Sequence, residues 1–269
     1  RYAERMYAYR ARHYVGPVLL ATFGGLALML GAIFLGISLT KSAPKWVMVA
    51  ISLTALAAFM AILFYTIFRL DRARKRSLST ALSALGLTML DKARKNPDAL
   101  AIAQPVIALL PMIPKDRGHV AWVASGDAQP LKALEHFYTT GSGKTQQTHI
   151  HTVLSWPAPA NWPIIALSRL GKMARFGQRI TGQKDLQTGD ADFDRNWDIA
   201  ASDEAFARSF LSPGVRAALA SAPPAETWLT AGQRIFCIFK GPLDGENLAK
   251  MHTHAQIVLG AVDRSLWTA

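Results

Sequence analysis

The chain has 269 residues, 51% of them hydrophobic, a net charge of +12 and a single cysteine. A basic balance of this size would suit nucleic-acid binding, but three of the net charges lie in residues 1–15, two in 41–45 and four in 69–76. The rest of the chain therefore lacks the basic face that nucleic-acid recognition needs. One cysteine also excludes a disulfide within the chain, and Cys237 lies in an apolar run that predicts a buried strand.

Residues 14–40 and 46–68 contain no charged side chain. A helix rises about 1.5 Å per residue, so roughly 20 apolar residues cross the hydrocarbon core of a bilayer. The sequence predicts a membrane α-helical hairpin followed by an α+β soluble domain. A cleaved signal peptide has a shorter apolar region, of about 7 to 15 residues, so we expect the first span to be retained as an anchor.

Basic segments determine the expected orientation of the hairpin. Residues 1–15 and 69–76 are both more basic than the loop at 41–45, and segments rich in Arg and Lys stay on the cytoplasmic side. We therefore expect the N-terminus and the C-terminal domain to be cytoplasmic, at a bacterial inner membrane. The side chains expected at the membrane surface are Arg69, Arg72, Arg74, Lys75 and Arg76.

Small residues recur four apart in the first span, so each pair shares one helix face. The second span also offers small residues, which are Ala50, Thr54, Ala57, Ala58 and Ala61. Such faces let helix backbones approach closely in lipid, either within the hairpin or against another membrane subunit. The predicted packing pairs are Ala21 with Gly25, Ala27 with Gly31, and Ala32 with Gly36.

Neither span contains Asp, Glu, Lys, Arg or His. An ion path usually needs an ionisable group inside the bilayer, and haem usually needs an axial ligand such as His. We expect no cofactor, and we interpret the hairpin as an anchor rather than a transport path.

After the anchor (1–76), the sequence predicts a helical connector at 77–116 and a cytoplasmic α+β domain at 117–269. Apolar spacing predicts a helix over 77–95 ended by Asn96-Pro97, and a short helix within 99–113. The remaining expected elements follow in chain order. They are a strand at 119–124, a helix at 131–138, strands at 149–156 and 164–170, helices at 203–211 and 212–221, a hairpin of strands at 227–230 and 234–240, and a closing helix at 243–266.

Three motifs attract functional interpretations. Residues 141–145 (Gly-Ser-Gly-Lys-Thr) resemble a phosphate loop, but the first glycine of that motif would fall at Tyr138 and a strand follows, so we expect a hairpin loop. The acidic segment 190–198 lacks the glycine and the terminal glutamate of a calcium loop. We expect a turn in which Phe193 and Trp197 point inward and the carboxylates are solvated or paired with Arg195.

Two His-x-His pairs complete the candidates. On a strand, His149 and His151 would face the same side and could share a metal, but no third ligand stands out nearby. On a helix, His252 and His254 would diverge. We therefore predict no catalytic residue, metal site or cofactor site.

The segment 189–199, with its Phe-Asp-x-x-Trp-x-Ile pattern, carries a resemblance. It resembles a domain of uncharacterised bacterial membrane proteins in which two N-terminal transmembrane helices precede a cytoplasmic domain of unknown function. The resemblance is densest at 189–220, and residues 234–266 are similar to the end of that domain. It implies a compact domain at a bacterial inner membrane and no particular activity. The other residues that carry the resemblance are Asp203, Ala207, Leu211-Ser212-Pro213, Val215 and Leu219.

The sequence favours a non-catalytic accessory or scaffold subunit of a larger inner-membrane complex. Its expected partners are membrane lipid and other membrane proteins, in an electron-transfer, photosynthetic, secretion or envelope assembly. The alternative is a membrane-tethered enzyme with a site built from Asp190, Asp192, His149 or His151. A lipid-surface sensor built on 69–76 is a further interpretation, although topology explains that basic run as well.

Overall fold

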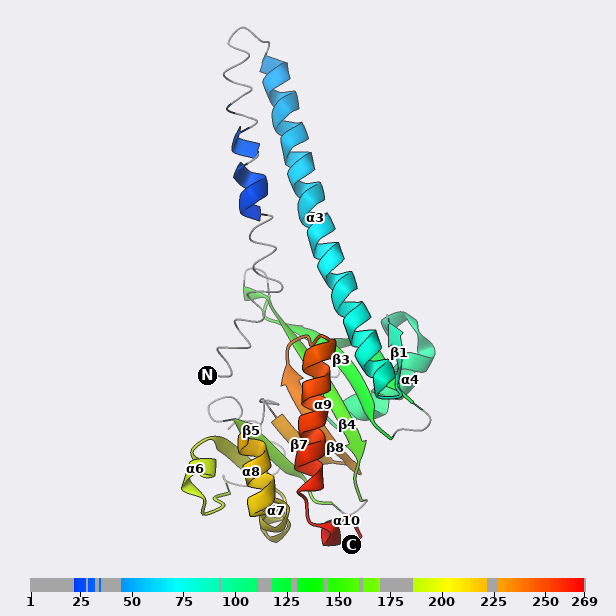
Figure 1. Cartoon of the computed structure of the whole chain (residues 1–269), viewed down its shortest axis with the longest axis vertical. Helices are drawn as coiled ribbons and strands as arrows, with labels where there is room; N and C mark the ends of the chain where they lie inside the picture. Colours follow the sequence, from blue (N-terminus) through cyan, green and yellow to red (C-terminus); the bar gives the residue numbers. More distant parts are fainter. Residues whose placement is uncertain are drawn as a thin grey trace. The chain divides into compact units, whose positions relative to one another are not determined.

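The computed structural model describes residues 22–27, 29–31, 34, 45–91, 93–110, 118–126, 130–142, 145–159, 162–169, 186–221 and 227–268. The chain divides into two compact units, Arg1–Arg76 and Ser77–Ala269. In the first unit, residues 22–27 and 29–31 are helical, and α3 (Lys45–Ala84) begins and continues into the second unit. Figure 1 shows the course of α3 and the elements that follow it.

Within the described residues, one helix is long and apolar enough to cross a membrane. Its most apolar window has a mean hydropathy of 2.2, and none of that window is buried by protein. The hydroxyls of Thr54 and Thr66 donate to the carbonyls of Ala50 and Ile62 at 2.9 and 2.8 Å. Those polar side-chain groups are therefore satisfied inside the helix, as a lipid environment requires.

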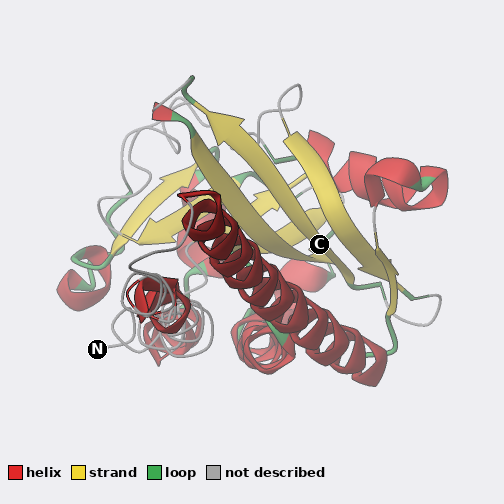
Figure 2. Cartoon of the chain, turned by 90° about the horizontal axis from the view of Figure 1, so that it is seen from above, coloured by secondary structure: helices red, strands yellow, loops and turns green. Residues whose placement is uncertain are grey.

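The second unit is built around one antiparallel eight-stranded sheet in the order β1-β2-β3-β4-β8-β7-β5-β6, so its α+β class is confirmed. Figure 2 shows the twist of the sheet. The strands are β1 (Thr88–Asp91), β2 (Gly118–Ser125), β3 (Lys132–Thr140), β4 (Gln147–Pro157), β5 (Ile165–Arg169), β6 (Trp197–Ala201), β7 (Thr227–Ala231) and β8 (Arg234–Lys240). The other elements are η2 (Ala93–Lys95), α4 (Pro97–Ala108), α6 (Ala191–Asp194), α7 (Glu204–Phe210), α8 (Pro213–Ser221), α9 (Gly245–Gly260) and α10 (Arg264–Trp267).

Helices cover both faces of the sheet. On one face, Ala99, Ala103 and Val106 of α4 join a buried cluster with side chains of six strands, among them Val153 and Phe236. On the other face, α9 lies against the sheet. The ring of His252 is 6.2 Å from that of Trp156, and the ring of His254 is 5.9 Å from that of Trp228. Successive side chains of a strand point to opposite faces of the sheet. Leu229 therefore packs on the α4 side, whereas its neighbour Trp228 packs on the α9 side.

The end of α3 differs from the sequence expectation of a helix through residue 95. Gly86 has φ of +70°, and the amides of Gly86 and Leu87 donate to the carbonyls of Ser83 and Leu82 at 2.9 Å. This is the glycine-dependent pattern that closes a helix and lets the chain change direction. The segment 77–116, expected to be a helical connector, consequently also supplies the edge strand β1.

Two further elements depart from the predicted pattern. Asn96 caps α4, accepting from the amides of Asp98 and Ala99 at 3.0 and 3.3 Å, so Asn96-Pro97 begins a helix rather than ending one. Residues 132–140 form β3, not a helix, because that segment pairs with β2 on one side and β4 on the other. Hydrogen bonding along both edges of this strand outweighs the local preference of the segment for a helix.

The start of α9 lies directly on the backbone at Ser77, within the second unit. The amide of Gly245 donates to the hydroxyl of Ser77 at 3.2 Å, and Asp244 caps the helix through the amide of Asn247 at 2.9 Å. A Cβ at position 245 would lie 2.6 Å from the carbonyl carbon of Ser77. Glycine is therefore required here by close backbone approach.

We predict that Gly245→Ala lowers the free energy of unfolding by about 1–3 kcal/mol, because the new methyl group forces two backbones apart. Gly260→Ala is the matched control, since a Cβ at the other end of the same helix meets nothing within 4 Å. The Gly260→Ala variant should leave the free energy of unfolding unchanged or raise it by up to about 1 kcal/mol. Denaturant unfolding of the full chain in detergent measures the free energy of unfolding of both variants. Equal losses in the two variants would contradict the close contact between Gly245 and the backbone of Ser77.

Candidate functional site

The acidic segment forms a self-contained turn before β6. The carboxylate of Asp194 accepts from the amide and hydroxyl of Thr188 at 3.0 and 2.7 Å and from the amide of Gly189 at 3.1 Å. Asp190 caps α6 through the amide of Phe193 at 3.1 Å, and its other oxygen is 3.2 Å from Nε of Arg216. The amide of Phe193, assisted by Arg216, lowers the pKa of Asp190.

The aromatic residues of this segment point inward, as the sequence predicted. Phe193 and Trp197 are each 4% exposed, and their rings stack with centroids 5.8 Å apart. Asp192 is solvated and pairs with Arg195 at 3.3 Å, whereas the partner of Asp190 is Arg216, which the sequence did not indicate. Within the described part of the chain, no three His, Cys, Asp or Glu side chains are placed to hold a metal ion.

A cluster of three histidines and a tyrosine lies on one face of β3 and β4. His149 and His151 share a side of β4, as their spacing predicted, and the strand register places Tyr138 opposite His149 and His136 opposite His151. The ring of Tyr138 stacks on those of His149 and His151, with centroids 4.9 and 5.7 Å apart. Sequence reasoning missed His136 because it predicted a helix over this strand.

The cluster is tightly enclosed at His136, which is only 2% exposed. Its imidazole lies over Gly118 on β2, where a Cβ would overlap the ring. His149 shares a 2.7 Å hydrogen bond with the hydroxyl of Thr140, but Nδ1 of His136 and Nδ1 of His151 have no partner among the described residues. Burial of two imidazoles side by side therefore favours their neutral forms.

Charge reinforces that preference. Burial, with the nearby His119, lowers the pKa of His136 to about 4. Burial also lowers the pKa of His151 to about 4, and His136, Lys240 and His149 act in the same direction. At neutral pH the His136–His151 pair is uncharged, which suits packing against the sheet more than acid–base exchange.

The other pair, His252 and His254, diverges on α9 as expected. His252 is half-buried beside Trp156, whereas His254 is buried, with Nε2 3.3 Å from the carbonyl oxygen of Ala218. Burial lowers the pKa of both. Cys237 is completely buried in β8, and burial raises the pKa of its thiol, so the sequence prediction of a buried strand cysteine is confirmed.

The residues proposed for a tethered enzyme do not converge. His149 and His151 lie on β4, whereas Asp190 and Asp192 precede β6, with β8, β7 and β5 between those strands. Four strand spacings of about 4.8 Å separate the two groups by roughly 19 Å. Residues 141–145 connect the antiparallel strands β3 and β4, so the predicted hairpin connection is confirmed, although Gly143 and Lys144 lie outside the described residues.

In the first unit, one predicted packing residue contacts the second apolar segment. A Cβ at Gly25 would overlap the ring of Phe59 on α3, whereas a Cβ at Gly24 or Gly31 meets nothing described within 4 Å. Figure 1 shows the helical residues around Gly25 beside α3. Ala27 is described and exposed. The predicted residues Ala21, Ala32 and Gly36 lie outside the described part of the chain.

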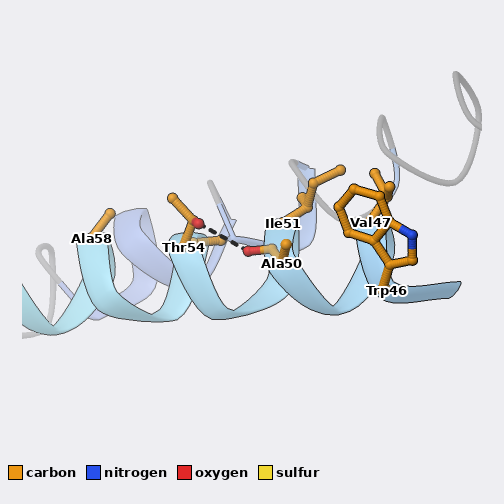
Figure 3. A pocket seen from close by; sticks show the side chains of 7 residues that line it. Trp46, Val47, Ala50, Ile51, Thr54 and Ala58 are labelled. Atoms are coloured by element: carbon orange, nitrogen blue, oxygen red, sulfur yellow. Dashed lines mark hydrogen bonds between the residues drawn. The ribbon is translucent and has the colours of Figure 1, made fainter. Parts of the chain in front are cut away.

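A hollow of about 410 Å³ follows the small-residue side of α3 (Figure 3). Ala50, Thr54 and Ala58 recur every four residues along it, so they share one helix face. All three are exposed. The residues that line the hollow are Trp46, Val47, Ala50, Ile51, Thr54, Ala55 and Ala58.

Comparisons with protein-family models, with curated proteins and with solved structures found no match to this chain. The resemblance carried by 189–220 therefore stays a prediction.

The neutral histidine pair predicts a loss of stability on acidification. The pKa of His136 is about 4 in the folded chain, against about 6.5 when unfolded. The unfolded chain thus binds more protons between these values, so stability is fully present above pH 6.5 and falls as pH decreases toward 4. For His136 alone the loss approaches about 3 kcal/mol.

Urea unfolding of the full chain in detergent at pH 7 and pH 4.5 checks this effect. His136→Gln should reduce the difference in the free energy of unfolding between pH 7 and pH 4.5. The double variant His136→Gln, His151→Gln should reduce that difference further. Both effects are expected whatever the variants do to stability at pH 7. An identical pH dependence in wild type and variants would contradict the neutral pair.

The acidic turn makes a separate prediction. Asp194→Ala removes the acceptor of three hydrogen bonds and should lower the free energy of unfolding by about 1–3 kcal/mol. Asp192→Ala should change it by less than about 0.5 kcal/mol, since that side chain is 90% exposed. Thermal unfolding distinguishes the two, and a larger loss in the Asp192 variant would show that the turn is held differently.

Proposed function

We propose that this protein is a non-catalytic, membrane-anchored accessory or scaffold subunit of a larger inner-membrane complex. Its two apolar segments form a helical hairpin, with the N-terminus and the C-terminal domain in the cytoplasm. The contact of Gly25 with Phe59 supports the hairpin, and the basic segments that flank the apolar stretches support the orientation.

The distribution of exposed apolar side chains carries the proposal. Among the described residues, every large hydrophobic side chain that is exposed lies between Phe23 and Phe68, except Ile257. An isolated exposed hydrophobic residue is ordinary on a soluble surface, whereas a continuous apolar helix surface needs lipid or another helix to cover it. Any apolar docking by the described residues is therefore concentrated in the anchor.

Within the anchor, the two sides of α3 differ. Half-buried residues recur at Ile51, Ala55, Phe59 and Leu63, which marks the face covered by the chain itself. The face formed by Ala50, Thr54 and Ala58 is exposed and lined by small side chains beside the hollow. In lipid, where no hydrophobic force pairs helices, such a face supports close packing of a partner helix. We assign this face to a helix of another subunit.

Photocrosslinking in intact membranes tests the assignment. A photoreactive amino acid at position 54 should give a discrete adduct of higher mass with another polypeptide. At position 56 it should capture lipid alone. The two positions are at nearly the same membrane depth but on opposite sides of the helix. Lipid adducts alone from both positions would contradict docking through this face, as would a uniform monomer after purification in mild detergent.

A further inference from the structure

The arginines at the end of the apolar part of α3 form a face suited to phosphate. Arg69, Arg72 and Arg76 are spaced by three and four residues, which places them on one side of the helix. All three are exposed. The small, exposed Ala73 lies among them and leaves room for a headgroup. Lys75 and Asp71 pair with each other at 3.6 Å and so contribute less to this face.

The next question is whether acidic side chains in the described part of the chain neutralise these arginines. Within the described residues, neither Arg69 nor Arg76 forms an ion pair, and Arg72 stacks on an aromatic ring. Its guanidinium carbon lies 4.4 Å from the ring centre of Phe68. That stacking holds the guanidinium beside the last aromatic residue of the apolar run, with its hydrogen-bond donors still available.

The same side of α3 is apolar just before the arginines. Ile62 and Tyr65 lie seven and four residues before Arg69 and are 44% and 65% exposed. Tyrosine is favoured at the boundary between hydrocarbon and headgroups. One helix side therefore offers an apolar surface for an acyl chain and, roughly 10 Å further along the axis, three cations.

If α3 spans the bilayer, the arginines reach headgroup depth. Residues 46–68 extend over about 33 Å as a helix, close to the hydrocarbon thickness of about 30 Å. A guanidinium can bind phosphate through two parallel hydrogen bonds. A zwitterionic lipid brings its own ammonium group to compete for the phosphate, whereas an anionic phospholipid does not.

We propose that Arg69, Arg72 and Arg76, with Tyr65 and Phe68, form a binding face for an anionic phospholipid. The proposal rests on the membrane span of the proposed function. It goes beyond anchoring, because it assigns lipid selectivity to a defined helix face.

Native mass spectrometry of the full chain tests the lipid face. The protein is reconstituted in nanodiscs of equal phosphatidylglycerol and phosphatidylcholine content, and the lipids retained after release are counted. Wild type should retain phosphatidylglycerol in excess over phosphatidylcholine. The combined change Arg69→Gln, Arg72→Gln and Arg76→Gln should remove that excess, each arginine accounting for about five-fold at most.

The matched control removes the same charge elsewhere. Arg195→Gln, Arg208→Gln and Lys250→Gln affect exposed side chains that pair with carboxylates in the second unit, so the lipid preference should persist. Equal loss in both triple variants would show a net-charge effect and overturn the assigned face. So would displacement of the lipid by inorganic phosphate, or equal retention of both lipids by wild type. Failure of wild type to enter nanodiscs would instead contradict the membrane span itself.

Discussion

The structure depends on one helix that must satisfy two different surroundings. Between Trp46 and Phe68, α3 carries mostly exposed apolar side chains, and the hydroxyls of Thr54 and Thr66 are bonded to the helix's own backbone. Ten and fourteen residues after Phe68, the side chains of Leu78 and Leu82 are at most 1% exposed within the second unit. A continuous helix satisfies all its interior backbone groups, which is the condition for crossing hydrocarbon.

Among the described residues of the second unit, Ile257 is the one large hydrophobic side chain that is exposed. The eight strands of this unit are covered by α4 on one face and α9 on the other, and the acidic and histidine-rich segments are occupied by internal contacts. The acidic turn uses Asp190 and Asp194 to hold its own backbone, and His136 and His151 lie on neighbouring strands as neutral rings. These internal contacts support the proposal that partners dock through the apolar segments rather than through the sheet.

Sequence reasoning succeeded where a local signal determined the structure. The long apolar helix, the strand pair at 227–240 and the inward Phe193 and Trp197 all follow from hydropathy, turn residues or side-chain type. It failed where tertiary pairing decided the outcome. Residues 132–140 have helical spacing but lie between two strands, and that error concealed His136 as the neighbour of His151. Gly86 was a readable signal for the end of α3, whereas the approach of Gly245 to Ser77 joins positions 168 residues apart and leaves no local trace.

The central claim is that α3 crosses the membrane and leaves the following domain on the cytoplasmic side. The buried native Cys237 is shielded from thiol reagents, so single introduced cysteines report on topology. We expect Ser42→Cys to react with a membrane-impermeant maleimide in intact bacterial cells. Gln256→Cys, on the exposed side of α9, should react only after the membrane is permeabilised. Labelling of position 256 in intact cells, with position 42 protected, would contradict the account.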